Sequence, residues 1–348
     1  MKTRRTLYGA ILAVMVVGLV GLGWSLFART ARAGMQVLTQ DRLLSAIAQG
    51  DTVEVENLFT KGALLEGKGS GGEIPLTTAA QAGKIDIVRM LIARGAHVDG
   101  TNTAGETALM EAIDSGMPDI ANLLLAKGTD AARRDLAGNT ALCYALSAAN
   151  ISPGSRGRGG VPTNSVDQAN AAMIRVLLEK TGQADAHDAQ GRTALMWAIQ
   201  HGDNTLVELL LAKNADVNIK DMAGKNALVV ALESWHTALA RRLLAKTTDI
   251  DVKGEGGATV LMWAVARDDT ALVKALLDRG AKVDTQDNTG ETALIGSAKE
   301  GKDASVALLL AHRANPALAD YQSMTALRWA VQRRHAGIAE RLRKAGAN

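Results

Sequence analysis

Apolar residues recur along most of the chain at a fixed spacing of 33 positions. The triplet Thr-Ala-Leu, or a looser version of it, begins at residues 41, 74, 107, 140, 193, 226, 259, 292 and 325. Its third residue is leucine in all nine copies, and alanine follows three positions later in every copy except the one with Ser297. One step of 53 residues contains an insertion over residues 150–169. This regularity indicates a tandem array of one structural unit.

Each copy has the pattern of two short helices. In the fifth copy, apolar residues at helical spacing follow Thr193, residues 201–203 interrupt them, and a second such stretch covers residues 205–213. A turn with the pattern Asp-x-x-Gly recurs at 135–138, 188–191, 221–224 and 287–290. Aspartate accepts hydrogen bonds from its own turn, and glycine adopts positive φ without a steric penalty. The sequence therefore predicts an all-α solenoid of about nine helix-turn-helix repeats.

The 33-residue period, the Thr-Ala-Leu helix start, the central glycine turn and the exit Ala-Asp-Val-Asn at 215–218 resemble the ankyrin repeat. The resemblance covers about residues 38–348. It implies that hairpin fingers and first helices line a concave protein-binding face, with second helices behind. The family has histidine after the leucine of the triplet, whereas this chain has Leu44, Thr77, Met110, Cys143, Met196, Val229, Met262, Ile295 and Arg328. We expect apolar packing to replace the hydrogen bonds of that histidine.

An uncharged, apolar stretch over residues 7–27 precedes the repeats. As a helix, its 21 residues would span about 31 Å, close to the hydrocarbon core of a bilayer, and Trp24 would lie near an interface. This predicts a signal anchor, with a short basic cytoplasmic segment (1–6) before it and a linker (28–37) after it. A signal peptide cleaved after Ala33 is the main alternative, and a buried soluble helix is the third.

Charge is distributed unevenly along the chain. The first 34 residues contain five basic and no acidic side chains, which leaves 34 basic against 36 acidic residues in the remainder. That balance, with 3% aromatic residues, argues against nucleic-acid binding by the repeats. A single cysteine excludes a disulfide framework and any multi-cysteine metal site.

Candidate catalytic groups are few. The six histidines lie in different copies, and His187, flanked by Asp185 and Asp188, is interpreted as part of a turn. Cys143 occupies an inward position and is interpreted as a core residue. Glu106 and Glu291 precede helix starts, where they would complement the helix dipole. We therefore expect no catalytic residue, no cofactor and no metal site.

Large side chains recur at the position after the missing histidine, and by resemblance this position is half-exposed on the concave face. Ordinary packing between repeats explains such a row, but so does a set of binding anchors, because tryptophan and tyrosine dominate binding hot spots. The candidate anchors are Tyr144, Trp197, Trp263 and Trp329, and the candidate rim residues are Arg192, Gln200, His201, Met222, Lys225, Tyr321 and Gln322. The insertion 150–169 is either a tolerated loop or a contact loop acting through Arg156 and Arg158.

These patterns favour a non-enzymatic, monomeric bacterial protein with a single inner-membrane span and its repeats in the periplasm. Its partner would be another protein, and it would either support an envelope enzyme or neutralise a toxin as an immunity protein does. The alternative is an exported effector or small-ligand binder, soluble in the periplasm or secreted after signal cleavage.

Overall fold

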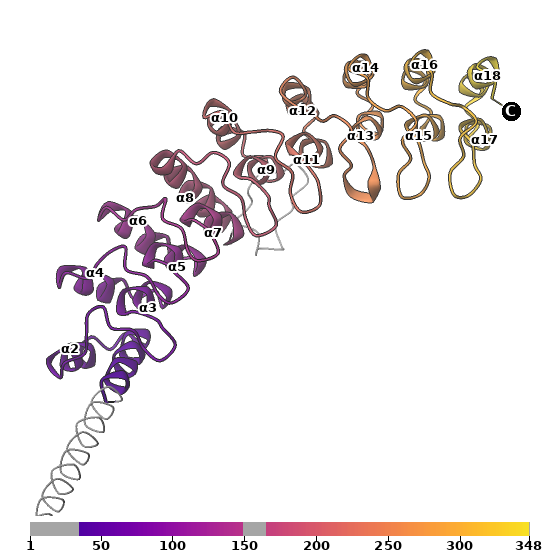
Figure 1. The fold of residues 1–348 in the computed structure, drawn as a ribbon. Coiled ribbons are helices and arrows are strands. Elements are labelled where there is room, and N and C mark those ends of the chain that lie inside the picture. Colours follow the sequence, from indigo (N-terminus) through magenta and orange to yellow (C-terminus); the bar gives the residue numbers. More distant parts are fainter. Residues whose placement is uncertain (1–34, 149–164, 348) are drawn as a thin grey trace, which may run out of the picture. The chain divides into compact units, whose positions relative to one another are not determined.

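The structure is a computed structural model that describes residues 35–148 and 165–347. It divides into an N-terminal unit, up to Tyr144, and a C-terminal unit, from Ala145 (Figure 1). Within these ranges the regular structure is helical, apart from isolated bridges of one residue pair each, such as Thr101 with Thr107. The predicted all-α repeat fold is confirmed. The predicted anchor over 7–27, the cleavage site at Ala33, Arg156 and Arg158 lie outside the described residues.

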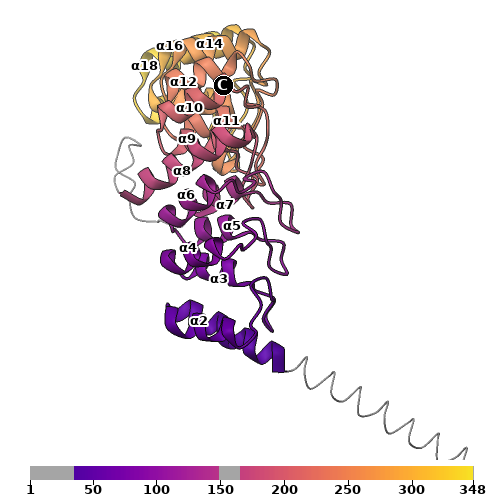
Figure 2. The same cartoon turned by 90° about the vertical axis from the view of Figure 1, so that its left-hand side faces the viewer.

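The N-terminal unit is a stack of helix pairs. Its first helix covers residues 35–49, and the others are α2 (Thr52–Thr60), α3 (Pro75–Gln81), α4 (Ile85–Ala93), α5 (Ala108–Asp114) and α6 (Pro118–Ala126), with α7 (Ala141–Ala148) crossing into the next unit. First helices pack on first helices, as α3 does on α5, and α4 packs on α6 behind them. The finger loops between pairs all project from the same side of this stack (Figure 2).

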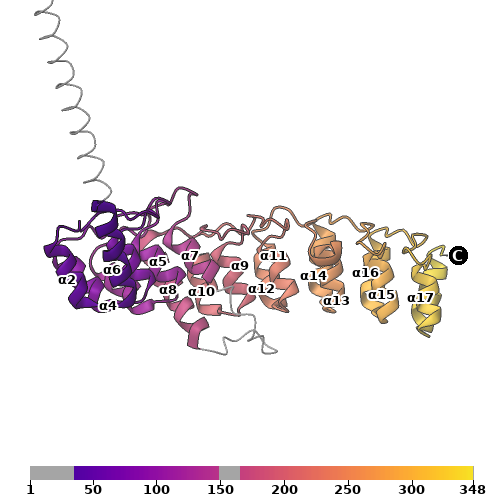
Figure 3. The same ribbon diagram turned by 90° about the horizontal axis from the view of Figure 1, so that it is seen from below.

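The C-terminal unit continues the same plan. Its helices are α8 (Ser165–Thr181), α9 (Ala194–Gln200), α10 (Asn204–Ala212), α11 (Ala227–Glu233), α12 (Thr237–Leu244), α13 (Val260–Ala266), α14 (Thr270–Asp278), α15 (Ala293–Glu300), α16 (Asp303–Ala311), α17 (Ala326–Gln332) and α18 (Ala336–Lys344). The first helices α9, α11, α13, α15 and α17 lie next to the fingers, and the second helices lie behind them (Figure 1; Figure 3). We call the surface formed by these first helices and their fingers the finger-side face.

The recurring triplet sets the start of each first helix. The threonine is the N-cap, and its hydroxyl accepts a hydrogen bond from the backbone N–H three residues later, as Thr193 does from Met196 at 3.2 Å. The alanine and leucine that follow are buried, as Ala194 and Leu195 are. Asn226 takes the same role in the sixth copy. The helix starts predicted from the triplet are confirmed at these positions.

The first copy departs from this pattern. Residues 35–49 form one helix, so it does not begin at Asp41, and residues 35–37 are helical instead of linker. Residues 35–48 contain neither glycine nor proline, which allows the helix to extend. Gln40 is buried and bonds the backbone of Leu64 and Gly67, and Asp41 accepts the N–H of Ser70. These side chains tie the first helix to the loop that follows α2.

The insertion also differs from expectation. Helix α8 begins at Ser165, so residues 165–169 are helical, and the prediction of a loop is wrong for them. Residues 165–181 contain neither glycine nor proline, whereas residues 153–162 contain both. Helix α8 is therefore 17 residues long, against nine or fewer for α10, α12, α14, α16 and α18.

Neighbouring fingers are joined by backbone hydrogen bonds. We number the four residues of each finger turn from its first position, which is Asp135 in the fourth copy. The second residue of one finger donates its N–H to the carbonyl of the third residue of the preceding finger, as Leu136 does to Ala104 and Met222 does to Gln190, both at 2.9 Å. This link requires the finger glycine to lie close to its neighbour. Gly105 has φ +81°, and a Cβ there would be 2.9 Å from the backbone nitrogen of Leu136.

Replacing Gly105 by alanine is expected to destabilise the N-terminal unit by about 2–3 kcal/mol, since the left-handed backbone alone costs an L-residue about 1–2 kcal/mol and the new methyl group also separates the two fingers. Gly138→Ala is the matched control, because Gly138 has φ +88° and an open Cβ position; it is expected to cost about 1 kcal/mol. Hydrogen exchange of peptides from α5 and α6 measures both values. Equal destabilisation would mean that the contact between fingers contributes nothing.

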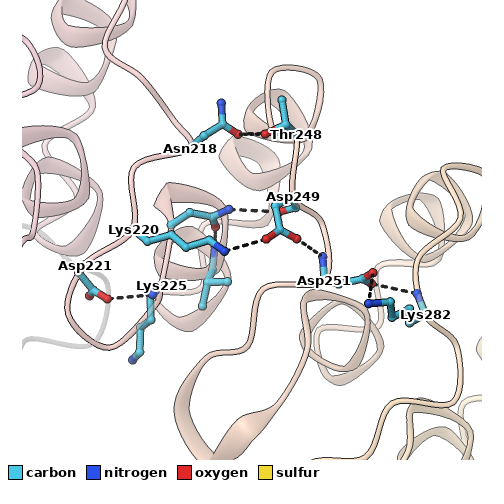
Figure 4. Close-up of polar contacts among 10 residues, drawn as sticks. Asn218, Lys220, Asp221, Lys225, Thr248, Asp249, Asp251 and Lys282 are labelled. Atoms are coloured by element: carbon cyan, nitrogen blue, oxygen red, sulfur yellow. Dashed lines mark hydrogen bonds and ion pairs between the residues drawn. The ribbon is translucent and has the colours of Figure 1, made fainter.

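Polar links also join the turns that follow the second helices (Figure 4). Asn218 Oδ1 accepts the N–H of Thr248 at 2.7 Å, Asp251 Oδ1 accepts that of Lys282 at 2.9 Å, and Lys220 Nζ pairs with Asp249 at 2.7 Å. Equivalent carboxylate-to-backbone bonds are made by Asp99, Asp185 and Asp284. The expectation that apolar packing alone would replace the family's histidine is therefore incomplete, because turn carboxylates also link the repeats.

Across the two ranges that the structure describes, none of the helices combines the length and the apolar character needed to cross a bilayer.

Candidate functional site

The aromatic row is more buried than the sequence suggested. Trp197 is 2% exposed and Trp329 is 9% exposed, while Tyr144 and Trp263 are half-buried. The expectation of half exposure is therefore wrong for Trp197 and Trp329. Each ring follows the N-cap of its helix by four positions, as Trp197 follows Thr193 and Trp329 follows Thr325.

A finger aspartate bonds the polar edge of two of these rings. Trp329 Nε1 donates to Asp320 Oδ2 at 2.8 Å, and the Tyr144 hydroxyl lies 2.8 Å from Asp135 Oδ2 and 2.8 Å from Glu106 Oε1. Burial raises the pKa of Asp320, but bonds from the Met324 N–H, Trp329 and the Gln322 N–H outweigh it and leave that pKa below its usual value. A buried ring with a polar edge thus finds its acceptor within its own repeat.

The rings of Trp197 and Trp263 have no such acceptor among the described residues. Asp188 Oδ2 is taken by Arg192, at 2.9 Å from Nε, and Trp197 stacks on His201 with ring centroids 4.2 Å apart. In the seventh finger, Gly254 stands where the fourth, fifth, sixth, eighth and ninth fingers have aspartate. A Cβ at Gly254 would lie 3.0 Å from Trp263 Nε1. The indole therefore occupies the space of the missing side chain.

A neighbouring carboxylate completes this finger. Glu233, at the end of α11, accepts the N–H of Glu255 at 2.7 Å and pairs with Lys225 Nζ at 2.8 Å. Arg267 lies over the exposed Trp235, 3.4 Å from its centroid, and 5.1 Å from that of Trp263. Lys225 and Arg192 are thus held by partners on the finger-side face.

A pocket of about 150 Å³ opens between α13 and α15. Met262, Trp263, Val265 and Ala266 form its apolar wall. The opposite side includes Gly296, the eighth-copy counterpart of Trp329, and the carboxylates Asp287, Glu291 and Glu300. The pocket exists because Gly296 leaves the ring position of this repeat empty.

Large apolar side chains project from the finger tips. Leu136, Met222 and Tyr321 are 81%, 82% and 75% exposed, and each is the second residue of its finger. Met222 and Tyr321 were predicted rim residues, as were Gln200 and Gln322, which are also exposed. Leu136 was missed, although it occupies the same position of the Asp-x-x-Gly pattern as Met222. Cys143 is buried beside Thr140, as expected of a core residue.

An acidic cluster lies on α5 and on the finger that precedes it, in the N-terminal unit. Asn102 Nδ2 donates to Glu106 at 2.7 Å and to Glu111 at 3.1 Å. Glu106 also meets the Tyr144 hydroxyl, so its role exceeds the dipole interaction expected of it. Burial, with the charges of Glu106 and Asp114, raises the pKa of Glu111 to about 7. Burial also raises the pKa of Tyr144 beyond its ordinary range, and bonds to Asp135 and Glu106 add to the effect.

Replacing Glu111 by glutamine is expected to change how stability depends on pH. The folded pKa lies above the unfolded value, so Glu111 favours folding below about pH 4.5 and loses that contribution as the pH rises through 7. At pH 8, Glu111→Gln should stabilise the N-terminal unit on the order of 1 kcal/mol, a value reduced by solvent screening of this half-buried group, and at pH 4 it should be neutral. Hydrogen exchange at both pH values tests this. A difference that is the same at pH 4 and pH 8 would contradict it.

Among the described residues, no group of three or more histidine, cysteine or carboxylate side chains is arranged to hold a metal ion. His187 contacts the carbonyl of Asp188 within its finger.

Comparison with known proteins agrees with the geometry. A family model described as ankyrin repeats (3 copies) matches residues 43–135, 164–221, 221–287 and 261–348. Among curated proteins none matches the chain. The matched ranges cover well over half of the sequence and coincide with the helix pairs. The chain belongs to the ankyrin-repeat family.

Proposed function

We propose that this chain is a non-catalytic protein-binding module, tethered to the extracytoplasmic side of a bacterial inner membrane, that holds its partner on the finger-side face of the C-terminal unit. Ankyrin repeats are protein-interaction modules, which supports the general role. The observation that carries the choice of face is the exposure of Met222 and Tyr321 at the finger tips. Tyrosine and methionine are enriched at protein–protein interfaces relative to the rest of the surface.

The fingers hold these side chains in place before binding. The carboxylates of Asp221 and Asp320 accept backbone N–H groups within their own turns, and the N–H groups of Met222 and Tyr321 bond the preceding fingers at 2.9 and 3.0 Å. A surface ordered in advance loses less conformational entropy on association. Binding of a folded protein partner therefore suits this face.

The membrane tether rests on the apolar stretch 7–27, and two periplasmic roles fit it: support of an envelope enzyme and neutralisation of a toxin. Adding the purified chain to its partner separates them, since support should leave or raise the partner's activity and neutralisation should abolish it. The mass of the protein isolated from cells tests the tether. An intact N-terminus is expected, whereas a chain starting at Gly34 in the medium would favour the exported alternative.

Affinity capture of the full chain from its native envelope tests the binding face. Met222→Ala with Tyr321→Ala should reduce capture of a stoichiometric partner at least tenfold. The control, Glu208→Ala with Arg242→Ala, removes an exposed ion pair on the second helices α10 and α12 and should leave capture unchanged. Trp197 is unsuitable for this test because truncating a buried ring would disturb folding. Equal capture by both variants would refute the assignment of the face.

A further inference from the structure

The pocket between α13 and α15 lies at a break in the pattern of the finger-side face. The fourth and ninth copies have both a finger aspartate and a ring that bonds it. The eighth copy keeps the aspartate, Asp287, but has Gly296 in place of the ring. The carboxylate of Asp287 therefore lines a pocket in which this copy has no aromatic side chain to donate a hydrogen bond to it.

Asp287 is arranged as Asp320 is. Its Oδ1 accepts the N–H groups of Thr289 and Glu291 at 2.8 and 2.9 Å, as Asp320 Oδ1 accepts those of Gln322 and Met324. In the ninth copy the second oxygen takes the indole N–H of Trp329. Gly296 has no donor to offer Asp287 Oδ2, so an incoming donor can take that place.

The charges of the pocket select a cation. Three carboxylates line it, and lysine, arginine and histidine are missing from its lining. Glu291 and Glu300 already pair with Lys299 and Lys302, which lie outside the lining, and among the described residues Asp287 forms no ion pair. The apolar wall of Met262, Trp263 and Ala266 suits a hydrocarbon stem beneath the charged head.

The size of the pocket selects a single side chain. A cavity of about 150 Å³ admits a benzene-sized group, whereas small-molecule sites usually measure about 300–1,000 Å³. Cations already lie over indoles of this face, with Arg267 5.1 Å from the Trp263 centroid and Lys299 4.8 Å from that of Trp329. Arg267 is held by the carbonyl of Leu232 and does not line the pocket.

We propose that this pocket receives an arginine side chain of the protein partner, with the guanidinium on Asp287 and against Trp263. A guanidinium is planar, forks onto carboxylates, stacks on aromatic faces and is less strongly hydrated than an ammonium, so it suits this pocket better than lysine. An aromatic side chain would fill the same space but would not neutralise Asp287. The inference builds on the proposed function, for which it names the chemistry that the face recognises.

The test uses the full chain in detergent micelles, labelled with fluorotryptophan and observed by fluorine NMR. The chain has five tryptophans, so Trp263 is a reporter and Trp24 and Trp197 are internal controls. The probe is N-acetyl-arginine methylamide, and the neutral isostere N-acetyl-citrulline methylamide is its matched control. The Trp263 resonance should shift as the arginine probe is added, with a dissociation constant in the millimolar range. The citrulline probe should bind at least fivefold more weakly.

Two variants locate the site. Gly296→Leu fills the pocket, and since a Cβ there meets only the mobile end of Glu291, the helix should fold. Asp287→Asn removes the charge and retains an acceptor for the turn. Each should weaken arginine binding at least fivefold. Equal binding of the citrulline probe, stronger binding of N-acetyl-tryptophan amide, or an unmoved Trp263 resonance would overturn the proposal. The probe experiment requires no protein partner. A failure of arginine-probe binding would therefore not contradict capture of a partner by Met222 and Tyr321, and a failure of capture would not contradict binding of the probe.

Discussion

Replacing Leu228 by alanine is expected to lower the free energy of unfolding of the C-terminal unit by about 3–4 kcal/mol. Leu228 is fully buried in α11, which packs on α9, α12 and α13. In a stack of repeats each helix pair depends on its neighbours, so a cavity here weakens contacts on both sides of the sixth copy. Chemical denaturation followed by circular dichroism, with hydrogen exchange of C-terminal peptides, measures the loss.

The control for Leu228 is Met222→Ala, because the Met222 side chain is 82% exposed. That change should stay within about 0.5 kcal/mol of the parent protein. A Leu228→Ala loss below about 1 kcal/mol would mean that the sixth copy does not transmit stability between its neighbours.

Replacing Asp320 by alanine is expected to destabilise the ninth copy by about 3 kcal/mol, because three donors lose their acceptor in a buried setting. These donors are the N–H groups of Gln322 and Met324 and the indole of Trp329. Since the pKa of Asp320 is lowered by folding, its contribution is present at neutral pH and is lost as the pH falls below the ordinary aspartate range. Hydrogen exchange of α17 and α18 measures the change.

Asp221→Ala is the matched control for Asp320→Ala. The side chain of Asp221 accepts the N–H of Lys225, and Val230 occupies the ring position of that copy. Its replacement should cost about 1 kcal/mol. Asp320→Asn keeps an acceptor oxygen and should recover part of the loss. If Asp221→Ala and Asp320→Ala were equally destabilising, the bond between finger aspartate and ring would carry no weight.

The helices were largely predictable, because their starts depend on local chemistry. Threonine or asparagine at the first position of the triplet caps the first helix, as Thr193 and Asn226 do, and glycine fills most of the finger positions at which φ is positive. The helix over 35–49 and the start of α8 at Ser165 were not predicted. Both extend beyond the repeat pattern, and the signal for them was a continuous run without glycine or proline.

The site was less predictable, because burial depends on contacts between repeats. Trp197 and Trp329 follow the same pattern as Trp263 yet are deeper, and their surroundings differ: Trp329 bonds a finger aspartate and Trp197 stacks on His201. Gly296 was a signal that could have been found, since it interrupts the row of large residues in aligned copies. Glu111 could not have been singled out, because its raised pKa results from Glu106 and Asp114 and from burial.

The repeats differ in whether they contain the finger aspartate, the aromatic ring, or both. The ninth copy has both, the seventh has the ring without the aspartate, and the eighth has the aspartate without the ring. In the ninth copy the two side chains bond each other, so Trp329 contributes to stability. The seventh and eighth copies leave an indole N–H and a carboxylate without their usual partner, and these lie where the proposed partner binds.

The central claim is that a protein partner binds the finger-side face of the C-terminal unit, and photo-crosslinking in living cells tests it most directly. A benzophenone amino acid would be placed in the full chain at Gln200 or Tyr321 on that face, and at Glu208 or Lys274 on α10 and α14. All four positions are exposed. The account predicts one adduct of the same mass from Gln200 and Tyr321 and none from the other two. An adduct formed from Glu208 or Lys274, with none from Gln200 and Tyr321, would contradict it.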